Sequence, residues 1–335
     1  MTTRIGILSF AHGHAEGYQA NLKSIPGVDL VGFSHENPEE GRHFSQEFDV
    51  HWFPDHRTLL AEGLDGVVIC SENANHLELV KLAAEAKCEI LCEKPIATNV
   101  ADAEAMKRIC QEKRVRFMTA FPMRFAQSTR AVRTMLKNGE LGRVLGISGI
   151  NHSEIPKGHR TWFADKQLAG GGAVMDHTVH LVDLLRWFFD AEVLDVYAEV
   201  ENPFLRNELD VDTAGLILLT LSNGVQASID CSWSRPRSYP RWGHVKMDFV
   251  GEKGTVVLDA FAQHLTLYSR GATRDPSWIG FGPDPNQAML EEFVRSIREN
   301  RDSSVTWNDG YEAMRVALAA YESARTGQPV AIDSS

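Results

Sequence analysis

The residues best suited to chemistry lie in one apolar stretch near the middle of the chain. Three glycines at 170–172 lead into a run that contains Asp176, His180 and Asp183. On a helix these positions are i, i+4 and i+7, so their side chains share one stripe. The surrounding residues are mostly valine, leucine and phenylalanine, which indicates a helix buried on several sides. An imidazole beside a carboxylate can move a proton near neutral pH. A core histidine satisfied by a local hydrogen bond fits the helix equally well.

A second candidate group follows two short apolar runs at 66–70 and 89–92. Lys94 stands between Glu93 and a proline, which restricts its backbone. Its ammonium could polarise a substrate oxygen, although a solvated surface lysine is the commoner case. The polar residues after the earlier run are Ser71, Glu72, Asn73 and His76.

The elements that must position these side chains alternate regularly over the first 120 residues or so. Strands are predicted at 4–9, 28–34, 66–70, 89–92 and 115–121, and helices at 13–24, 38–48, 75–86 and 99–112. Continuous apolar strands separated by helices predict an α/β domain with a doubly wound parallel sheet. Ligands of such sheets bind at the carboxyl ends of the strands, so we expect a cofactor there.

The first strand–helix turn departs from the dinucleotide pattern G-x-G-x-x-G. Ser9 and Ala11 stand where the first two glycines are expected. Small residues still permit close backbone approach, so we predict that the backbone amides from Phe10 to Gly13, together with the dipole of the following helix, bind a pyrophosphate. The imidazoles of His12 and His14 could donate to the pyrophosphate or ligate a metal. No further ligand lies nearby in the sequence, so we predict no metal.

The end of the second strand bears on the choice of dinucleotide. His35 occupies the position where an acidic residue would bind the adenosine ribose, and Glu36 follows it. No arginine or lysine occurs from 33 to 41, whereas a 2′-phosphate usually calls for one. We therefore predict NAD over NADP. A protonated His35 would favour the 2′-phosphate, which leaves NADP as the alternative.

These motifs together resemble those of the Gfo/Idh/MocA family, which includes glucose–fructose oxidoreductase and inositol dehydrogenase. The resemblance covers nearly the whole chain. Its elements are E-K-P at 93–95, Asn73 and His76 in an N-x-x-H segment, Arg124-Phe125, G-G-G-x-x-x-D-x-x-x-H at 170–180, and a closing G-x-P-V at 327–330. The altered glycine turn, and Glu72 in place of the usual proline, depart from the family pattern.

The resemblance implies a Rossmann domain followed by an α+β domain with a large, mostly antiparallel open sheet. We place these domains at 1–122 and 123–335. Strands predicted at 143–152, 194–200, 214–221, 226–233, 244–250, 254–258 and 264–268, and helices at 286–300 and 308–325, support the second domain. The Gly- and Pro-rich segment 269–285 is predicted to be irregular, either a lid or a surface loop. Such a sheet commonly has one face exposed or in an interface, so we expect a homodimer or homotetramer formed through it.

The resemblance also implies an NAD(P)-dependent dehydrogenase or reductase acting on a secondary alcohol of a sugar, cyclitol or related polyol. In that mechanism His180 is the base in oxidation and the acid in reduction, Asp176 orients the substrate or the imidazole, and Lys94 contacts both substrate and nicotinamide ribose. His177 adjoins the Asp176–His180 pair in sequence but points about 100° away from Asp176 around the helix. The predicted cofactor-binding residues are Ser9, Phe10, Ala11, His12, His35, Ser71, Glu72, Asn73, His76, Glu93, Lys94 and Arg124. The predicted substrate-binding residues are Lys94, His152, Arg160, Trp162, Asp176, His177 and His180, with 159–162 matching a family segment at the site rim.

Two alternatives come from other relatives of the family. One is a glycosidase that holds NAD tightly and oxidises its sugar transiently. The other is a dinucleotide or sugar sensor without turnover. Lys94, Asp176 and His180 together argue against the sensor, because a binder needs no proton-transfer pair.

Composition restricts the partners. The 335-residue chain has a formal net charge of −11, which argues against nucleic acid or an anionic membrane surface. No apolar run approaches the ~20 residues of a membrane span, and the chain leads directly into a strand rather than a secretory signal. Five cysteines form no CxxC motif, which favours a reducing cytoplasm. Three arginines and three aromatic residues gather at 233–242. This segment suits a solvated interface loop, or a site for an acidic sugar or phosphate.

Overall fold

The structure, a computed structural model, describes residues 2–156, 160–268 and 277–333. The chain forms two compact units. The first contains Met1–Pro122, Gln167–Gly170 and Asn286–Tyr311, and the second contains Met123–Lys166, Gly171–Pro285 and Glu312–Ser335. We expected all of 123–335 to form one domain. That expectation was wrong for the segments 167–170 and 286–311, which belong to the first unit.

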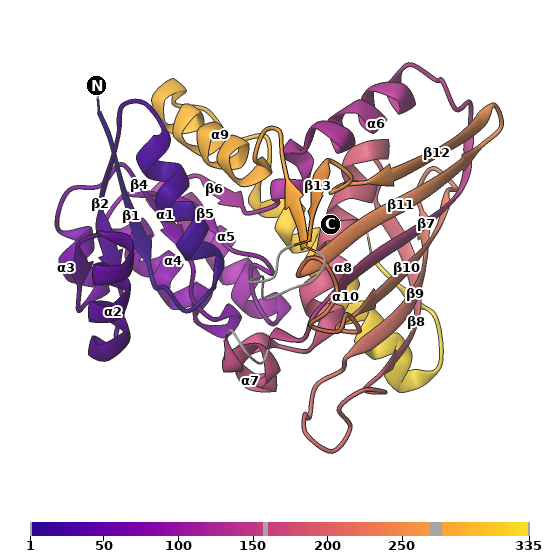
Figure 1. The fold of residues 1–335 in the computed structure, drawn as a ribbon, viewed down its shortest axis with the longest axis horizontal. Coiled ribbons are helices and arrows are strands. Elements are labelled where there is room, and N and C mark those ends of the chain that lie inside the picture. The colour runs from indigo at the N-terminus through magenta and orange to yellow at the C-terminus, as the bar shows by residue number, and fades with distance from the viewer. Residues whose placement is uncertain (1, 157–159, 269–276, 334–335) are drawn as a thin grey trace. The chain divides into compact units, whose positions relative to one another are not determined.

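The first unit is built on a six-stranded sheet of strand order β3-β2-β1-β4-β5-β6, with every neighbouring pair parallel (Figure 1). Its central strands are fully buried or nearly so because helices cover both faces, as the continuous apolar runs predicted. The strands are β1 (Thr3–Leu8), β2 (Val28–Ser34), β3 (Trp52–Phe53), β4 (Gly66–Ile69), β5 (Glu89–Cys92) and β6 (Phe117–Thr119).

The helices of this unit begin and end at recognisable signals. Asn37 caps α2, accepting hydrogen bonds from the backbone N–H groups of Glu39 and Glu40. Asn99 caps α5 in the same way, and that helix ends at Arg114 in the left-handed conformation. The helices are α1 (His14–Ser24), α2 (Pro38–Phe48), α3 (His56–Leu60), α4 (His76–Glu85) and α5 (Val100–Lys113), with a 3₁₀ turn at Asn73–Asn75.

Two later helices add to the first unit through contacts that are distant in sequence. In α9 (Pro285–Glu299) the side chain of Arg298 donates to the Thr3 hydroxyl and to the carbonyl of Gly27. At the start of α10 (Trp307–Thr326) the Trp307 indole N–H donates to the carbonyl of Ala103, 2.9 Å away. These contacts explain why the first unit includes 286–311.

The second unit contains a seven-stranded sheet of order β12-β11-β7-β10-β9-β8-β15. Only the β7–β10 pair is parallel, and all its other pairs are antiparallel, which confirms the predicted mostly antiparallel sheet. Its strands are β7 (Val144–Ser153), β8 (Val193–Glu201), β9 (Ala214–Leu221), β10 (Gln226–Ser232), β11 (Gly243–Gly251), β12 (Gly254–Asp259) and β15 (Val330–Ala331).

One face of this sheet is covered by α8 (Ala173–Phe189), which packs against β7, β9 and β10 (Figure 1). Side chains along β9 alternate between buried and exposed, as expected for a sheet with one covered face. The exposed positions of the whole sheet include large apolar residues on β7, β9, β11 and β12, namely Leu145, Leu216, Leu218, Val250 and Val257.

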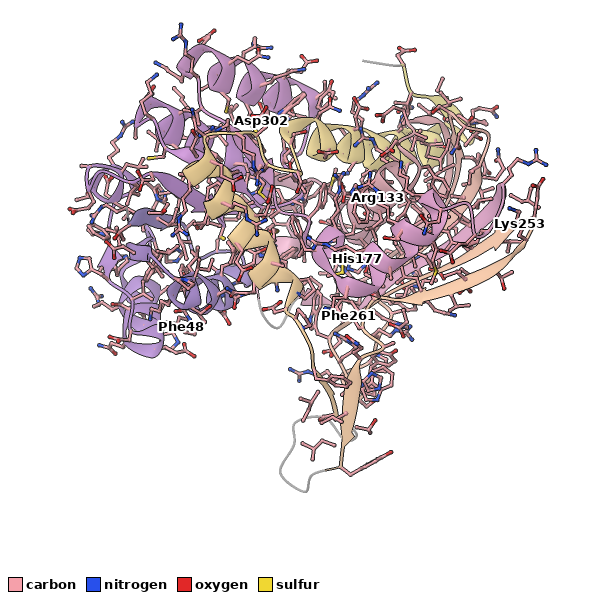
Figure 2. The ribbon with its side chains drawn as sticks, turned by 90° about the horizontal axis from the view of Figure 1, so that it is seen from above. Phe48, Arg133, His177, Lys253, Phe261 and Asp302 are labelled. Atoms are coloured by element: carbon pink, nitrogen blue, oxygen red, sulfur yellow. The ribbon has the colours of Figure 1, made fainter. Side chains whose placement is uncertain are left out.

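The remaining elements of the second unit include α6 (Gln127–Lys137) and a separate hairpin of β13 (His264–Leu267) and β14 (Ser277–Gly280). The short helix α7 (Lys166–Ala169) crosses the division between the units. Figure 2 shows the hairpin extending beyond the seven-stranded sheet, with Phe261 near its base. We expected the whole of 269–285 to be irregular. That was wrong for β14 and for Pro285, while 269–276 lie outside the described residues. Among the described residues, no helix is long and apolar enough to cross a membrane.

Candidate active site

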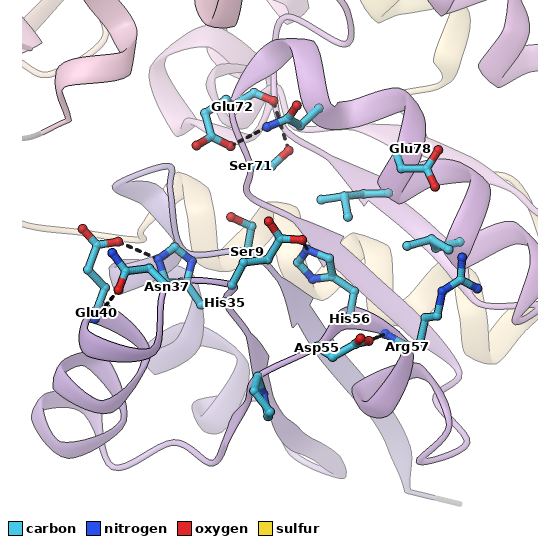
Figure 3. Close-up of a pocket in the computed structure, with 15 residues that line it drawn as sticks. Ser9, His35, Asn37, Glu40, Asp55, His56, Arg57, Ser71, Glu72 and Glu78 are labelled. Carbon is cyan, nitrogen blue, oxygen red and sulfur yellow. Dashed lines mark hydrogen bonds and ion pairs between the residues drawn. The ribbon is translucent and has the colours of Figure 1, made fainter.

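A cavity of about 540 Å³ opens where β1, β2 and β4 end in the first unit (Figure 3). Its location at the carboxyl ends of parallel strands is where a doubly wound sheet binds its ligand. Four of the predicted cofactor residues line it: Ser9, His35, Ser71 and Glu72. The other lining residues are Glu36, Asn37, Glu40, Pro54, Asp55, His56, Arg57, Asn75, Glu78, Leu79 and Leu82.

The first strand–helix turn has one residue in the backbone conformation that glycine favours, in spite of its missing glycines. Ser9 has a φ of 68°, the left-handed conformation that favours glycine. The side chain of Phe10 is fully buried among Phe33, Phe44 and Phe48. Phe10 therefore presents only its backbone to a ligand. The left-handed turn and the adjoining cavity fit the binding of a dinucleotide.

Several backbone amides of this turn already have partners within the protein. The N–H of Phe10 donates to His35 Nδ1 at 3.4 Å, and that of Ala11 donates to the Ser9 hydroxyl at 3.1 Å. The N–H of His12 donates to the Cys70 carbonyl at 2.8 Å, and that of His14 donates to His12 Nδ1 at 3.1 Å. Sequence reasoning did not anticipate this, because three of these bonds go to side chains and the fourth goes to the backbone of a distant strand end.

His35 links the turn to α2. Its Nδ1 accepts from Phe10, so Nε2 carries the ring hydrogen and donates to Glu40 Oε2, 2.7 Å away. Next to it, the Ser34 hydroxyl lies 2.7 Å from His56 Nδ1. Burial lowers the pKa of His56, so this imidazole is neutral at pH 7.

The charges around the cavity are mainly negative. Five carboxylates line it, from Glu36, Glu40, Asp55, Glu72 and Glu78. The guanidinium that lines it, that of Arg57, follows the amino-terminal cap of α3. Sequence reasoning missed Arg57 because it considered only the segment next to β2. The excess of negative charge around the cavity suits a ribose hydroxyl better than an added 2′-phosphate.

Asn73 and His76, which were also predicted to contact the cofactor, are buried. The Asn73 side-chain N–H donates to the Ala169 carbonyl at 2.9 Å. His76 is fully buried, with Nδ1 donating to the Ile96 carbonyl at 3.1 Å, and burial lowers its pKa. The Asn73 side chain thus contacts the backbone at the end of α7, and the His76 side chain contacts the loop that follows Lys94.

At the carboxyl end of β5, Glu93 and Lys94 are both buried. His14 Nδ1 lies 2.9 Å from Glu93 Oε1, and His12 Nε2 lies 3.9 Å from Glu93 Oε2. Burial by itself would raise the pKa of Glu93, but His14 and His12 hold it well below its ordinary value. The donor atoms of these three residues lie within 4.8 Å of one another, the spacing of a metal-binding group. The fold brings Glu93 to His14 across 79 positions of sequence, and to His12 beside it.

In the second unit, Asp212 caps the start of α8 from outside the helix. Its Oδ1 accepts from the N–H of Gly172 at 2.8 Å, and its Oδ2 accepts from the N–H of Val174 at 2.7 Å. The hydroxyl of Tyr321 donates to Asp212 Oδ1 and accepts from the N–H groups of Gly172 and Met175. A Cβ on Gly172 would lie 1.9 Å from the Asp212 carbonyl oxygen, which explains the glycine. The glycine run therefore allows close docking of the segment that fixes α8.

On α8, Asp176 and His177 are buried and His180 is partly exposed. His177 Nε2 lies 3.2 Å from Asp176 Oδ2, and His177 Nδ1 donates to the Asn151 carbonyl at 2.9 Å (Figure 2 labels His177). We expected His177 to point away from Asp176. That was wrong, because an imidazole is long enough to bend back to the preceding carboxylate. Nδ1 of His180 is buried.

The remaining predicted substrate residues lie in the second unit. His152 Nε2 is 3.0 Å from Asp230 Oδ1 on the neighbouring strand, and burial lowers the pKa of His152. Trp162 is buried and stacks on Phe163 with ring centroids 4.0 Å apart. Arg160 is partly exposed, and His159 of the same segment lies outside the described residues.

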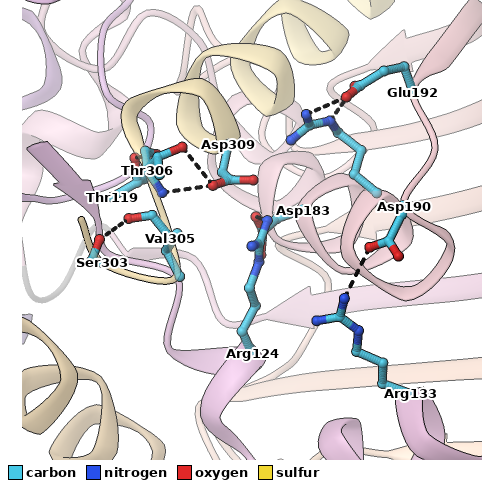
Figure 4. A network of polar contacts seen from close by, with 11 residues as sticks. Thr119, Arg124, Arg133, Asp183, Asp190, Glu192, Ser303, Val305, Thr306 and Asp309 are labelled. Carbon is cyan, nitrogen blue, oxygen red and sulfur yellow. Dashed lines mark hydrogen bonds and ion pairs between the residues drawn. The ribbon is translucent and has the colours of Figure 1, made fainter. Parts of the chain in front are cut away.

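Arg124, a predicted cofactor residue, forms a buried pair with Asp183 (Figure 4). Its Nε and Nη2 donate to the two carboxylate oxygens at 2.9 and 2.6 Å. The pair connects the start of the second unit to α8. Arg133 and Asp190, 3.0 Å apart in the same view, form a more exposed pair.

Comparison with known proteins agrees with this architecture. Residues 5–121 match the family described as "Oxidoreductase family, NAD-binding Rossmann fold", and residues 129–257 match "GFO/IDH/MocA C-terminal domain". An inositol 2-dehydrogenase of Acidothermus cellulolyticus is 28% identical, covering 98% of this chain and 95% of that protein. A D-apiose dehydrogenase of Paraburkholderia graminis is 26% identical, covering 98% and 89%.

Solved structures show the same fold. A myo-inositol 2-dehydrogenase from Lactobacillus plantarum superposes with a TM-score of 0.86 at 22% identity, covering 99% of this chain and 100% of that one. GenD2 from gentamicin A biosynthesis, solved in complex with NAD, gives a TM-score of 0.89 at 21% identity over 99% and 97%. With its NAD-binding Rossmann unit and its second, mostly antiparallel unit, the chain belongs to the Gfo/Idh/MocA family of oxidoreductases.

Proposed function

We propose that this oxidoreductase transfers hydride between NAD and a secondary alcohol of a sugar, cyclitol or related polyol. The observation that carries the proposal is α8, an otherwise mostly apolar helix that holds Asp176, His177 and His180. Burying Asp176 and His177 is costly, so their retention beside His180 is better explained by chemistry than by packing. The relatives named as inositol and apiose dehydrogenases support the substrate class.

His180 carries the proton in this proposal. When bound, NAD supplies the hydride acceptor for oxidation of the alcohol to a ketone. The hydroxyl proton must leave from the same substrate, and an imidazole is suited to take it. Because Nδ1 of His180 is buried while the residue is partly exposed, we assign the transfer to Nε2.

Lys94 and Asp176 prepare the substrate for that step. The ammonium of Lys94 donates a hydrogen bond to the reacting oxygen and stabilises the negative charge that develops on it. Asp176 accepts hydrogen bonds from substrate hydroxyls while its carboxylate stays beside His177. His152, Arg160, Trp162 and His177 complete the proposed substrate set.

The cofactor set that we propose consists of the cavity residues Ser9, His35, Ser71 and Glu72, together with the turn residues Phe10, Ala11 and His12. Glu93 and Lys94 extend this set at the end of β5, and Asn73, His76 and Arg124 support it from buried positions. The acidic lining supports NAD rather than NADP.

The test is a screen of purified protein with NAD and NADP against a panel of inositols, aldoses and other polyols. We expect NADH absorbance to accumulate with at least one cyclitol or sugar. Release of an aglycone from a glycoside without net NADH would instead establish the NAD-dependent glycosidase. Tight NAD binding with no turnover of any panel member would favour the sensor.

The outward face of the seven-stranded sheet supports a further part of the proposal. Its exposed apolar side chains, including Leu216, Leu218 and Val257, are suited to an interface between copies of the chain. We propose a homodimer or homotetramer formed through this face, to be tested by light scattering. Five buried, free thiols suit the reducing environment of the cytoplasm, which is the location we propose.

A further inference from the structure

The histidines of the first strand–helix turn form a cluster with Glu93, and the proposed function gives one member of it, His14, no role. His12 and His14 approach the two oxygens of Glu93 at 3.9 and 2.9 Å. Glu93 is fully buried, and the His14 side chain is 40% exposed. Such a cluster lies at the turn where a Rossmann unit receives the pyrophosphate of its dinucleotide.

Four of the backbone N–H groups at this turn are engaged within the protein. A glycine-rich turn offers its backbone N–H groups to phosphate. Here the N–H groups of Phe10, Ala11, His12 and His14 donate to partners within the protein. A pyrophosphate would have to displace those bonds or find other donors.

The hydrogen-bond pattern prepares the imidazoles to act as those donors. The Glu93 carboxylate is ionised and can only accept, so His14 Nδ1 donates to it. The other ring nitrogen of His14, Nε2, can then donate to a phosphate oxygen when the ring carries its second proton. Glu93, behind the ring, compensates the positive charge of that form.

The same pattern argues against a metal ion. His12 Nδ1 accepts from the N–H of His14, so the ring hydrogen of neutral His12 sits on Nε2, the nitrogen that faces Glu93. A metal ligand at Nε2 would need a lone pair there. Glu93 therefore accepts a hydrogen bond from His14, and the Nε2 of His12 that carries the ring hydrogen faces it from 3.9 Å, beyond hydrogen-bond distance, although the spacing of the three residues would admit a metal.

We infer that His14, held by Glu93 and supported by His12, binds the pyrophosphate of the dinucleotide in place of the backbone amides of a glycine turn. This inference rests on the NAD binding in the proposed function and assigns that binding to side chains particular to this turn. The titratable groups around His14 are Glu93 and Lys94 after β5, His12 in the turn, Tyr18 on α1, and Cys70 and Cys92 beside Glu93.

The experiment compares ligands that differ in phosphate. Calorimetry would measure adenosine, ADP and NAD binding to the wild type, His14→Gln and the control His43→Gln. Glutamine at 14 retains an N–H for Glu93 but cannot carry charge. His43 also pairs with a glutamate, at 3.2 Å, but lies exposed on α2. We expect His14→Gln to weaken ADP and NAD by about 10- to 100-fold, the range of a charged hydrogen bond, and to leave adenosine unchanged.

Equal loss of adenosine and ADP affinity would overturn the inference, because His14 would then act on the shape of the cavity. Unchanged ADP and NAD affinity would also overturn it.

Two further outcomes separate the inference from its alternatives. Stoichiometric binding of Zn²⁺ alone to the wild type, lost in His14→Gln while ADP affinity stays unchanged, would establish a metal site and refute the inference. Failure of the wild type to bind NAD would refute the dinucleotide function and this inference together. Normal NAD binding without dependence on His14 would refute this inference alone.

Discussion

Replacing Asp212 tests whether the cap on α8 positions the proposed catalytic residues. Asp212→Ala removes the acceptors of the Gly172 and Val174 N–H groups and the partner of the Tyr321 hydroxyl. Each charged hydrogen bond contributes about 1.5–3 kcal/mol, and Asp212 is partly exposed, so water replaces some of that contribution. We therefore expect a local loss of about 2–4 kcal/mol at the start of α8.

Hydrogen exchange is the suitable assay because a chain of two units need not unfold in one step. The amides of Gly172, Val174 and Met175 should exchange faster in Asp212→Ala, whereas those of β4 and β5 should not. Turnover should fall while NAD affinity is retained, since the cavity residues belong to the first unit. Arg206→Ala, which breaks an exposed pair with Glu201, serves as the control. Unchanged exchange at Gly172 and Val174 would refute the role of the cap.

Three further predictions follow from buried or charged groups. Arg124→Ala should destabilise the second unit by about 3–5 kcal/mol because it leaves Asp183 charged and buried. Arg133→Ala, which breaks a more exposed pair, should cost at most about 1 kcal/mol. Denaturant unfolding of both variants measures the two losses of stability. Glu36→Ser should raise NADP affinity relative to NAD, most at low salt, because it removes a carboxylate from the cavity; an unchanged ratio would argue against charge as the discriminator. Burial lowers the pKa of His76, so on acidification the unfolded chain is protonated at His76 before the folded chain is. The contribution of neutral His76 to the free energy of unfolding is therefore complete above the unfolded pKa near 6.5, and it is lost as the pH falls through the lower folded pKa. His76→Asn should flatten that acid dependence and His43→Asn should not, as pH-dependent unfolding would show.

Most of the fold could be predicted from the sequence because its signals are local. Apolar runs such as 66–70 identified the parallel strands. Alternation along 225–233 supported the antiparallel sheet with one covered face that the family resemblance implies. Most of the elements that were missed, namely β3, α3, α7, β14 and β15, are five residues or shorter and present too little pattern for recognition. The helix α6, of 11 residues, was missed as well.

The candidate site was less predictable because its contacts join distant segments. Nothing near His14 indicates that Glu93 will lie 2.9 Å away, and nothing near Gly172 identifies Asp212 as its partner. Arg57 enters the cavity from an element that was not predicted. The motifs could indicate which residue types matter, but only the fold could show which of them already have partners.

The measurement that tests the central claim most directly is the turnover of His180→Ala with the substrate identified by the panel. If His180 carries the proton, the rate of NADH formation should fall by about 100-fold or more while NAD affinity and the folded state are retained. Lys94→Ala should lower the rate of NADH formation by as much. Asp176→Asn should lower it less, partly through weaker substrate affinity, and the exposed control His43→Ala should leave it unchanged. Near-normal turnover by folded His180→Ala would contradict the account and remove His180 as the acid–base residue.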